Sequence, residues 1–483
     1  MGFSAVQRVV GFLIAGSSLM MLPPVLVSFW YQDGTATLFM GSAAILLTLG
    51  LLIYFPVRGA TEELRLRDGF LIVVGAWLAL VLVGALPFVL LTSPELSYVD
   101  AVFESMSGLT TTGATIVTNI DELPRAVLYY RQQLQWLGGM GIIVLAVAIL
   151  PMLRIGGMQL YRAETPGPMK DAKLTPRITE TAKALWLIYV GITATCALAY
   201  WLAGMKLFDA VGHAFSTVAI GGFSTHNDSL AYWSNPTVEA VAIVFMVIAG
   251  INFALHFTAW RRASAQPYFL DPELRVYATL LFAFSVLVSF LLFLTGTYDT
   301  LATSFRYGTF QVISAMTTTG FTTASFYSWQ GALPVILILL AFIGGCAGST
   351  AGGMKVIRVI LLYRQSVREI RRLIHPHAVI PVKIGGQRTS DRVISAVWGF
   401  FFLYIANFAV MTIMLTATGL DAETAYSAVG ACITNLGPAL GDAGPNYAAL
   451  NDAAKVILSA AMLLGRLEIY TLLVLLTPAF WRG

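Results

Sequence analysis

The sequence predicts an all-α polytopic membrane protein in which ten transmembrane helices surround four re-entrant pore loops, in pseudo-fourfold helix–loop–helix repeats. Composition is the first reason: 57% of the 483 residues are hydrophobic and 11% are charged, whereas soluble domains carry about 25% charged residues. Length is the second reason, because a helix that spans a bilayer needs ~20 apolar residues. Ten segments reach that length, at residues 9–31, 36–56, 69–92, 127–151, 183–204, 236–258, 274–296, 333–361, 394–418 and 453–478.

Four short glycine-containing stretches are the third reason. Each lies in a weakly hydrophobic segment between two strongly hydrophobic ones, with a glycine at the same point. Such a segment is too short to cross the bilayer as a helix and return. It can enter and leave by one face where surrounding protein buries its backbone. The stretches contain Thr110-Thr111-Thr112-Gly113, Ile220-Gly221-Gly222, Thr318-Thr319-Gly320 and Asn435-Leu436-Gly437.

The order of these segments predicts how the chain is divided. After the first two apolar segments, the other eight form four pairs, and each pair brackets one glycine stretch. Asp100-Ala101-Val102 and Asp209-Ala210-Val211 precede the first two stretches, which supports duplication. We expect an N-terminal transmembrane helix pair at 1–68, followed by pore repeats at 69–153, 154–260, 261–372 and 373–483.

The basic residues predict the orientation of the chain. Ten spans place both termini on one side, and that side carries most of the Lys and Arg residues, including the run from Lys355 to Arg392. By the positive-inside rule, both termini are cytoplasmic and the glycine stretches open outward. The outer side also carries many carboxylates, among them Asp100, Glu104 and Asp228. They either form an acidic vestibule that concentrates cations or solvate ordinary loops.

The glycines have a chemical reason. In an ion filter the backbone turns its carbonyl oxygens toward an axis, often at positive φ, and four chain segments approach closely; both requirements favour glycine. None of the four stretches contains a carboxylate, which a divalent site would use. The pattern therefore favours a large monovalent cation. The alternative is small-residue packing between helices. Packing explains one such stretch well, but it explains less well why four stretches each lie between a pair of apolar segments.

With these motifs the chain resembles the Trk/Ktr/HKT superfamily of potassium transporters, and the TrkH type within it, over nearly its whole length. The N-terminal helix pair, Trp136-Leu137-Gly138-Gly139-Met140-Gly141 and Gly221-Gly222-Phe223-Ser224-Thr225 carry the resemblance together with the four stretches. It implies that K⁺ is the transported ion, with no organic cofactor on this chain. Some sodium-conducting relatives have serine at the first filter glycine, so Gly113 favours K⁺. The fourth stretch departs most from the pattern. The resemblance implies a K⁺ filter at Thr110, Thr111, Thr112, Gly113, Ile220, Gly221, Gly222, Thr318, Thr319, Gly320, Asn435, Leu436 and Gly437.

A glycine-rich break interrupts the eighth apolar segment. Five glycines fall within Gly344–Gly353, and each disfavours helix by about 1 kcal/mol relative to alanine. We expect unwound backbone at membrane depth, which is tolerated inside protein or against water. The resemblance identifies this stretch as an intramembrane gating loop; the alternative is a tight helix-packing patch. The candidate gate residues, one of them in the last apolar segment, are Gly345, Gly348, Ser349, Thr350, Gly352, Gly353, Lys355 and Arg466.

Arg466 and Glu468 lie near the middle of the last apolar segment. Charge within the membrane is costly and marks function by default. A spacing of two residues puts the pair on different helix faces, so they need not contact each other. We expect Arg466 to face the pore below the filter, where the family carries an arginine, or else to link the helix to a backbone carbonyl. We assign no role to His213, His226 or His256, and expect Cys196, Cys346 and Cys432 to be unpaired buried thiols.

The cytoplasmic stretch Arg364 to Arg372 is basic and partly amphipathic. It could lie on the anionic headgroups of membrane lipids or dock a cytosolic partner. The resemblance implies the second: a TrkA-type ring of cytosolic nucleotide-binding subunits on a homodimer of this chain, in a bacterial inner membrane. The chain itself contains no phosphate loop or dinucleotide fingerprint. No nucleic-acid partner is expected.

The resulting expectation is potassium uptake through a gated, selective pore, and not an enzyme. Coupling to H⁺ or Na⁺ stays open as an alternative. A proton-coupled carrier would usually show a relay of intramembrane carboxylates, for which Glu468 is the clear candidate. A membrane-embedded enzyme would need a constellation of catalytic side chains at one depth, and we find none in the sequence.

Overall fold

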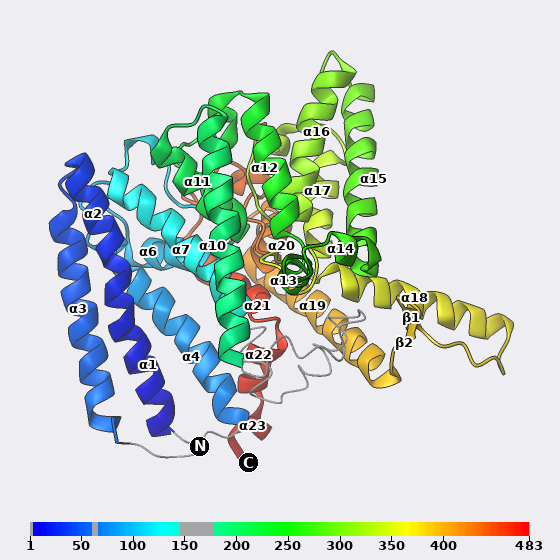
Figure 1. Ribbon diagram of the computed structural model, residues 1–483, viewed down its shortest axis with the longest axis horizontal. Helices are drawn as coiled ribbons and strands as arrows, with labels where there is room; N and C mark the ends of the chain where they lie inside the picture. The colour runs from blue at the N-terminus through cyan, green and yellow to red at the C-terminus, as the bar shows by residue number, and fades with distance from the viewer. Residues whose placement is uncertain (1–2, 60–65, 145–177, 483) are drawn as a thin grey trace.

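The computed structural model describes residues 3–59, 66–144 and 178–482, and these are helical apart from one short β-hairpin, β1–β2 (Figure 1). The hairpin pairs Lys383–Ile384 with Gln387–Arg388. The main helices are α1 Phe3–Ser17, α2 Leu22–Tyr31, α3 Ala36–Tyr54, α4 Leu66–Gly84, α5 Leu86–Val89, α6 Tyr98–Leu109, α7 Arg125–Val144, α10 Ile178–Leu202, α11 Leu207–Ala219, α12 Pro236–Ala249, α13 Phe253–Arg262, α14 Gln266–Leu270, α15 Pro272–Leu294, α16 Leu301–Met316, α17 Leu333–Ile343, α18 Val356–Ile374, α19 Asp391–Ala417, α20 Ala422–Ile433, α21 Asp452–Arg466, α22 Tyr470–Leu473 and α23 Pro478–Arg482.

Six described stretches are long and apolar enough to cross a membrane: Phe3–Tyr31, Ala36–Val57, Asp68–Val89, Ala182–Leu202, Pro272–Leu294 and Asp391–Ala417. They coincide with six of the ten expected spans. Two further expected spans are sharply bent, where the sequence suggested straight helices. The helices α12 and α13 meet at 92°, and α21 meets the segment Tyr470–Leu476 at 109°.

The last two expected spans differ in another way. The segment 333–361 is interrupted: α17 ends at Ile343 and α18 begins at Val356, which confirms the predicted break. The segment 127–151 corresponds to α7, whose described part ends at Val144, and its remainder lies outside the described residues. The total of ten spans therefore stays a prediction.

One order of elements recurs four times: a long helix, a short helix, a loop and a second helix. The four sets are α4–α6–α7, α10–α11–α12, α15–α16–α17 and α19–α20–α21. The short helices have 12 to 16 residues, and at 1.5 Å per residue they reach about 18–24 Å, less than the ~30 Å hydrocarbon core. Side chains cap three of them at the start: Ser97, Thr300 and Asp421 accept backbone hydrogen bonds. These four helices are therefore too short to cross the hydrocarbon core.

The other helices frame this arrangement. The helices α1, α2 and α3 lie at one edge of the molecule, and α18 with the hairpin projects at the opposite edge (Figure 1). Helices α1 and α3 approach closely, because a Cβ on Gly50 would overlap the backbone of Ala15; small residues permit such contacts between membrane helices. The beginning of α1 and the end of α23 lie along the same lower edge in this view.

Candidate functional site

The four short helices end in the same backbone turn. Two residues before the last glycine of each stretch the backbone is left-handed, with φ of 52° at Thr111, 56° at Ile220, 62° at Thr318 and 58° at Asn435. The N–H of the next residue then reaches back five positions; Thr112 N donates to Ser107 O at 2.9 Å, and the other three bonds measure 2.7–2.8 Å. A bond of this kind is typical of a Schellman cap. Non-glycine residues with positive φ carry local strain, and such strain clusters at functional sites.

The glycines that follow bring the four turns together. Gly113, Gly222, Gly320 and Gly437 have φ between 80° and 96°. A Cβ on each would overlap a carbonyl oxygen of the next turn: Gly113 meets Gly221 O, Gly222 meets Thr319 O, Gly320 meets Leu436 O, and Gly437 meets Thr112 O. The turns therefore form a closed ring in chain order, and each contact requires glycine. We call residues 110–113, 220–222, 318–320 and 435–437 turns 1 to 4.

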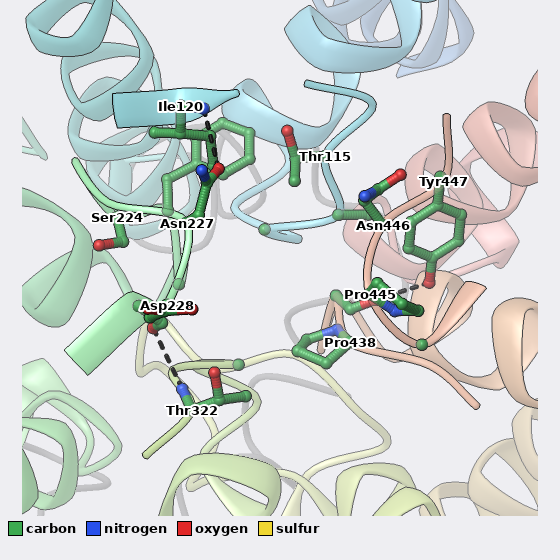
Figure 2. Close-up of a pocket in the computed structure, with 18 of the residues that line it drawn as sticks. Thr115, Ile120, Ser224, Asn227, Asp228, Thr322, Pro438, Pro445, Asn446 and Tyr447 are labelled. Carbon is green, nitrogen blue, oxygen red and sulfur yellow. Dashed lines mark hydrogen bonds between the residues drawn. The ribbon is translucent and has the colours of Figure 1, made fainter. Parts of the chain in front are cut away.

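A cavity of about 340 Å³ lies on one side of the ring. Its wall comes from the segments that follow all four glycines, including Thr115, Ser224, Thr322 and Tyr447 (Figure 2). Asp228 is the one carboxylate among its described lining residues. The other outer carboxylates do not form the acidic lining considered above: Glu104 is fully buried, and Asp100 lies 2.6 Å from Lys455 Nζ.

The turns differ in how side chains hold them. In turn 1 the hydroxyls of Thr110 and Thr112 lie 2.8 Å apart, and Thr317, directly before turn 3, forms the same pair with Thr319 at 2.7 Å. Turns 2 and 4 have Gly221 and Leu436 at the corresponding position and lack the pair. There, side chains from elsewhere hold backbone oxygens: Gln135 Nε2 donates to Gly221 O at 2.6 Å, and Tyr447 Oη donates to Gly437 O at 2.6 Å. Asn435 Nδ2 also donates to Thr112 Oγ1 at 3.0 Å, joining turn 4 to turn 1.

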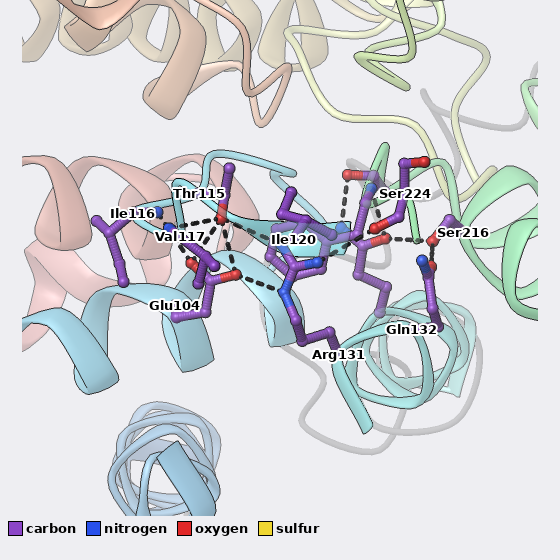
Figure 3. A network of polar contacts seen from close by, with 12 residues as sticks. Glu104, Thr115, Ile116, Val117, Ile120, Arg131, Gln132, Ser216 and Ser224 are labelled. Atoms are coloured by element: carbon purple, nitrogen blue, oxygen red, sulfur yellow. Dashed lines mark hydrogen bonds and ion pairs between the residues drawn. The ribbon is translucent and has the colours of Figure 1, made fainter. Parts of the chain in front are cut away.

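A buried ion pair supports turns 1 and 2 (Figure 3). Arg131 Nε lies 2.8 Å from Glu104 Oε1, and both side chains are fully buried. Arg131 also donates to Ser224 O at 3.2 Å and to Thr115 Oγ1 at 3.1 Å, and its guanidinium lies 4.2 Å from the centre of the Phe223 ring. The pair thus joins α6 and α7 to the segments after turns 1 and 2. A buried polar atom that loses its partner costs more free energy than one of these hydrogen bonds contributes. Removal of any one side chain of the network should therefore destabilise the protein.

The segment Gly344–Lys355, the intramembrane loop, lies against the other side of the ring. Gly352 N donates to Thr318 Oγ1 at 2.7 Å, Gly353 N donates to Thr434 O at 3.0 Å, and Thr350 Oγ1 donates to Val218 O at 2.9 Å. These acceptors lie at or before turns 2, 3 and 4, whereas the cavity is lined by the glycines of the turns and by residues that follow them. The loop therefore faces the ring from the side opposite the cavity.

Arg466 holds the loop from the end of α21. Its Nη1 donates to Thr350 O at 3.1 Å and its Nη2 donates to Gly138 O at 3.2 Å, and the residue is 2% exposed. These bonds agree with the second alternative drawn from the sequence, a link to backbone carbonyls, whereas the pore-facing position stays a prediction. Glu468 does not contact Arg466; it lies 2.7 Å from Arg358 Nη2 of α18.

The base of the loop rests on α15 and on the bend between α12 and α13. One oxygen of the buried Glu273 accepts from Ala347 N at 2.8 Å and from Ile357 N at 3.1 Å, so it bridges the start of the loop and the start of α18. At the bend, Gly250 O accepts from Cys346 N at 2.9 Å. Within the loop, Ser349 Oγ donates to Cys346 O, and Lys355 Nζ donates to Ala351 O.

His226 is one of the residues that line the cavity. Its Nδ1 lies 2.5 Å from Asp121 Oδ1 and its Nε2 lies 3.7 Å from Asp209 Oδ1, while its ring stacks on Tyr232 with centroids 3.6 Å apart. Burial alone would lower the pKa of His226, but the neighbouring carboxylates of Asp209 and Asp121 outweigh burial and hold that pKa above its ordinary value. The contact joins the segments after turns 1 and 2.

The structure thus places the candidate filter residues in one ring and the candidate gate residues in the layer against it. Sequence reasoning missed four side chains that support these layers: Glu104, Arg131, Gln135 and Glu273. The sequence could have revealed them, because each is a polar or charged residue among apolar ones, and such residues in membrane segments often have a function. In the part of the chain that the structure describes, no group of three His, Cys, Asp or Glu side chains could hold a metal ion. The three cysteines are buried and unpaired, as expected.

Comparison with known proteins places this arrangement in a family. The family model TrkH, described as cation transport protein, matches residues 36–482. The chain is 55% identical over 482 residues to the Trk system potassium uptake protein TrkH of Halomonas elongata and 51% identical over 482 residues to that of Escherichia coli strain K12; each alignment covers all of both chains. The crystal structure of the potassium transporter TrkH from Vibrio parahaemolyticus matches with a TM-score of 0.93 and 49% identity, again over all of both chains.

These matches confirm the resemblance drawn from the glycine stretches. They also confirm that the chain is a transporter and not an enzyme, with the all-helical, multi-span fold of these relatives and the bent helix pairs described above. The chain belongs to the TrkH family of cation transport proteins.

Proposed function

We propose that the chain is the pore subunit of a potassium uptake system. One observation carries the proposal: four turns of equal backbone conformation close into a ring through glycine–carbonyl contacts. A ring of backbone oxygens can replace the hydration shell of K⁺. The names of the relatives, potassium uptake proteins, support this choice of ion.

The filter in this proposal consists of turns 1 to 4. Their lack of carboxylates suits a weakly hydrated monovalent cation. The hydroxyl pair in turns 1 and 3 and the side chains Gln135 and Tyr447 at turns 2 and 4 hold the backbone in place. A filter needs this support because an ion site is precise only when its backbone cannot relax around a smaller ion.

The gate in this proposal is the intramembrane loop with Arg466. The loop lies across the side of the ring away from the outer cavity, and four hydrogen bonds fix it there, from Thr350, Gly352, Gly353 and Arg466. Opening requires these bonds to exchange for bonds to water. The fixed charge of Arg466 adds an electrostatic barrier to a cation in the same place.

The remaining assignments belong to the same proposal. Ten spans form an N-terminal pair and four pore repeats, with the boundaries given above, and both termini are cytoplasmic in a bacterial inner membrane. The chain acts as a homodimer on a TrkA-type nucleotide-binding ring, and the Trk system in the names of the relatives supports such partners. The surface of α18 suits docking, because Ile370, Leu373 and Ile374 are exposed beside its arginines.

Uptake of ⁸⁶Rb⁺ into proteoliposomes tests the proposal, with and without a pH gradient, a Na⁺ gradient and the cytosolic partner. We expect uptake that needs no gradient and is suppressed by K⁺ more than by Na⁺. Uptake that strictly requires a gradient would show coupled symport instead; Glu468, the carboxylate suggested for a proton relay, is already paired with Arg358. If neither K⁺ nor Rb⁺ enters under any of these conditions, the proposal is wrong.

A further inference from the structure

A large apolar groove lies outside the pore, between α10, α12, α13 and α15. Its volume is about 960 Å³. The walls are aliphatic and aromatic, and the polar groups within it are few. Representative lining residues are Gly191 and Ile192 of α10, Phe245 and Ile248 of α12, Trp260 of α13 and Leu274 of α15.

The position of the groove indicates what fills it. Helices α10 and α15, which flank it, are both long and apolar enough to span a membrane. Two residues at its rim are exposed, Leu187 by 59% and Trp260 by 68%. An apolar groove that opens between spanning helices is filled by hydrocarbon in preference to water. An exposed tryptophan at its end is typical of the level of the lipid headgroups.

The basic residues beside the groove indicate which kind of lipid headgroup binds there. Helix α13 runs at 92° to α12 and ends in Arg261 and Arg262, both exposed, immediately after Trp260. Guanidinium groups bind phosphate through paired hydrogen bonds, and basic residues at the cytoplasmic surface attract anionic lipids. We propose that the groove binds an anionic phospholipid, with an acyl chain against Gly191 and Phe245 and its phosphate on Arg261 and Arg262.

The wall of the groove is also the support of the intramembrane loop. Ile251 lines the groove at the bend between α12 and α13. On the inner face of this bend Gly250 O accepts from Cys346 N at 2.9 Å, and Phe253 N donates to Gly348 O at 3.0 Å. His256 spans the bend from inside the groove, 3.0 Å from Ile248 O and 2.8 Å from Tyr268 Oη. A bound lipid therefore holds the bend that holds the loop, and it favours the loop position seen here. This second step rests on the proposed gating function, whereas the lipid site does not.

The lipid site is tested by filling the groove. A Cβ on Gly191 would meet no atom within 4 Å, so Gly191→Leu occupies the groove without clashing with the protein. Gly41→Leu on α3 is the matched control, since it lies in another spanning helix, is exposed and has the same free space. The readout is native mass spectrometry of full-length protein taken from vesicles of three parts phosphatidylcholine to one part phosphatidylglycerol.

We expect wild-type protein and G41L to retain phosphatidylglycerol, and G191L to lose it roughly tenfold, because a leucine side chain excludes several methylenes of an acyl chain. The double variant R261Q/R262Q should keep a bound lipid but lose the preference for phosphatidylglycerol by roughly tenfold. Equal retention by G191L and wild type overturns the proposal. So does a groove occupied by a second copy of the chain, which would show unchanged lipid and loss of the dimer in G191L.

The link to the gate is tested by ⁸⁶Rb⁺ flux in the same vesicles. We expect the wild-type flux to fall severalfold as phosphatidylglycerol increases, and the G191L flux to stay constant. If the wild-type protein retains phosphatidylglycerol but its flux does not change with the amount of this lipid, the lipid site stands and the link to the gate is wrong. Absence of all flux in every lipid would count against the proposed transport function, and the retention measurement would still decide the site.

Discussion

The ring of turns and the intramembrane loop lie in contact, yet they acquire their conformations in opposite ways. Each turn is the end of its own short helix, and the bond from Thr112 N to Ser107 O spans five residues. Among the described residues the loop occurs once, and it rests on distant elements: Thr350 bonds to Val218, and Gly353 bonds to Thr434. The turns are locally encoded and repeated fourfold, whereas the conformation of the loop depends on tertiary contacts.

Under the proposed function, this difference assigns ion selection to the ring and gating to the loop. A locally capped turn that is also locked to its neighbours by glycine contacts has few alternative conformations. A glycine-rich loop held by a small number of hydrogen bonds can exchange them for others, and such bistable segments serve as switches. We therefore expect selectivity to depend on the ring and regulation to depend on the loop, with little overlap between the two.

The largest effect should come from breaking the support of the ring with Arg131→Met. Removing one partner leaves Glu104 charged and buried, which typically costs 3–5 kcal/mol. The variant should lose several degrees of thermal stability in detergent, together with uptake. Arg368→Met is the control, because Asp391, its partner at 2.9 Å, is exposed and such surface pairs contribute about 0–1 kcal/mol. Equal melting temperatures for the two variants would show that the ring does not depend on this network.

Selectivity is tested next by Gly113→Ser. A Cβ at this position would overlap Gly221 O, and φ is 83°, so the local backbone must move. We expect roughly a tenfold loss of preference for K⁺ over Na⁺, about 1.4 kcal/mol, in protein that still folds. Gly296→Ser is the matched control, since Gly296 has φ of 65° and free space around a Cβ. Reversal potentials or competition fluxes give the ratio; an unchanged ratio in G113S would exclude Gly113 from the filter.

The contrast between ring and loop also explains what the sequence could predict. Positions of the turns follow from Thr-Thr-Gly and related patterns, and the break after Ile343 follows from its glycines, because glycine propensity is a local property. Partners far apart in sequence, such as Glu104 with Arg131 and Glu273 with Ala347, are not visible in propensity or periodicity.

The bends of the helices were missed for a related reason. Hydropathy records how apolar a segment is, and it does not record its direction. The segment 236–258 therefore reads as one span, although it turns at residues 250–252. A local signal was present there: Asn252 caps α13 by accepting from Ala254 N at 2.8 Å, and asparagine is one of the residues preferred at the start of a helix.

The loop is tested by shortening Gly345–Gly352. Loss of this segment removes the bonds to Val218 and Thr318, so we expect a severalfold higher flux that no longer responds to the partner, with K⁺ selectivity intact. Gly352→Ala is a milder change. Because its Cβ would overlap Thr434 O, it should displace the loop from turn 4 instead of stiffening it. The measurements are the flux with and without the partner and the K⁺ to Na⁺ ratio of each variant. If the partner still controls the flux fully after the deletion, the loop is a helix-packing patch and not the gate.

Arg466→Ala also tests whether selectivity depends on the ring and regulation on the loop. The change removes the bonds to Thr350 O and Gly138 O and a positive charge below the ring. We expect a few-fold higher flux with an unchanged K⁺ to Na⁺ ratio, and a loss of stability of about 1–3 kcal/mol from the carbonyls left unpaired. Arg466→Lys, which keeps the charge but loses the two-armed geometry, should regain the barrier but not the stability. A stable R466A protein with wild-type flux would rule out both roles.

The smallest effect concerns the outer rim, where His226 joins the segments after turns 1 and 2. Its folded-state pKa is raised above 6.5 by Asp209 and Asp121, against the effect of burial. The folded protein therefore binds this proton more tightly than the unfolded chain does. The resulting stabilisation is fully present below the ordinary pKa and disappears as pH rises through the folded value.

The thermal stability of wild-type protein and His226→Gln should accordingly converge as pH rises above the ordinary pKa of histidine, with the wild type more stable at the acid end. The neutral glutamine can still bond to Asp121, so the contact is kept while its pH dependence is removed. Uptake should be little affected, since His226 lies outside the ring, in the segment that follows turn 2. If the difference between the two proteins is constant with pH, the imidazole contributes through its stacking on Tyr232 and its charge does not matter. If H226Q instead changes the K⁺ to Na⁺ ratio, His226 takes part in ion selection, and selectivity does not depend on the ring alone.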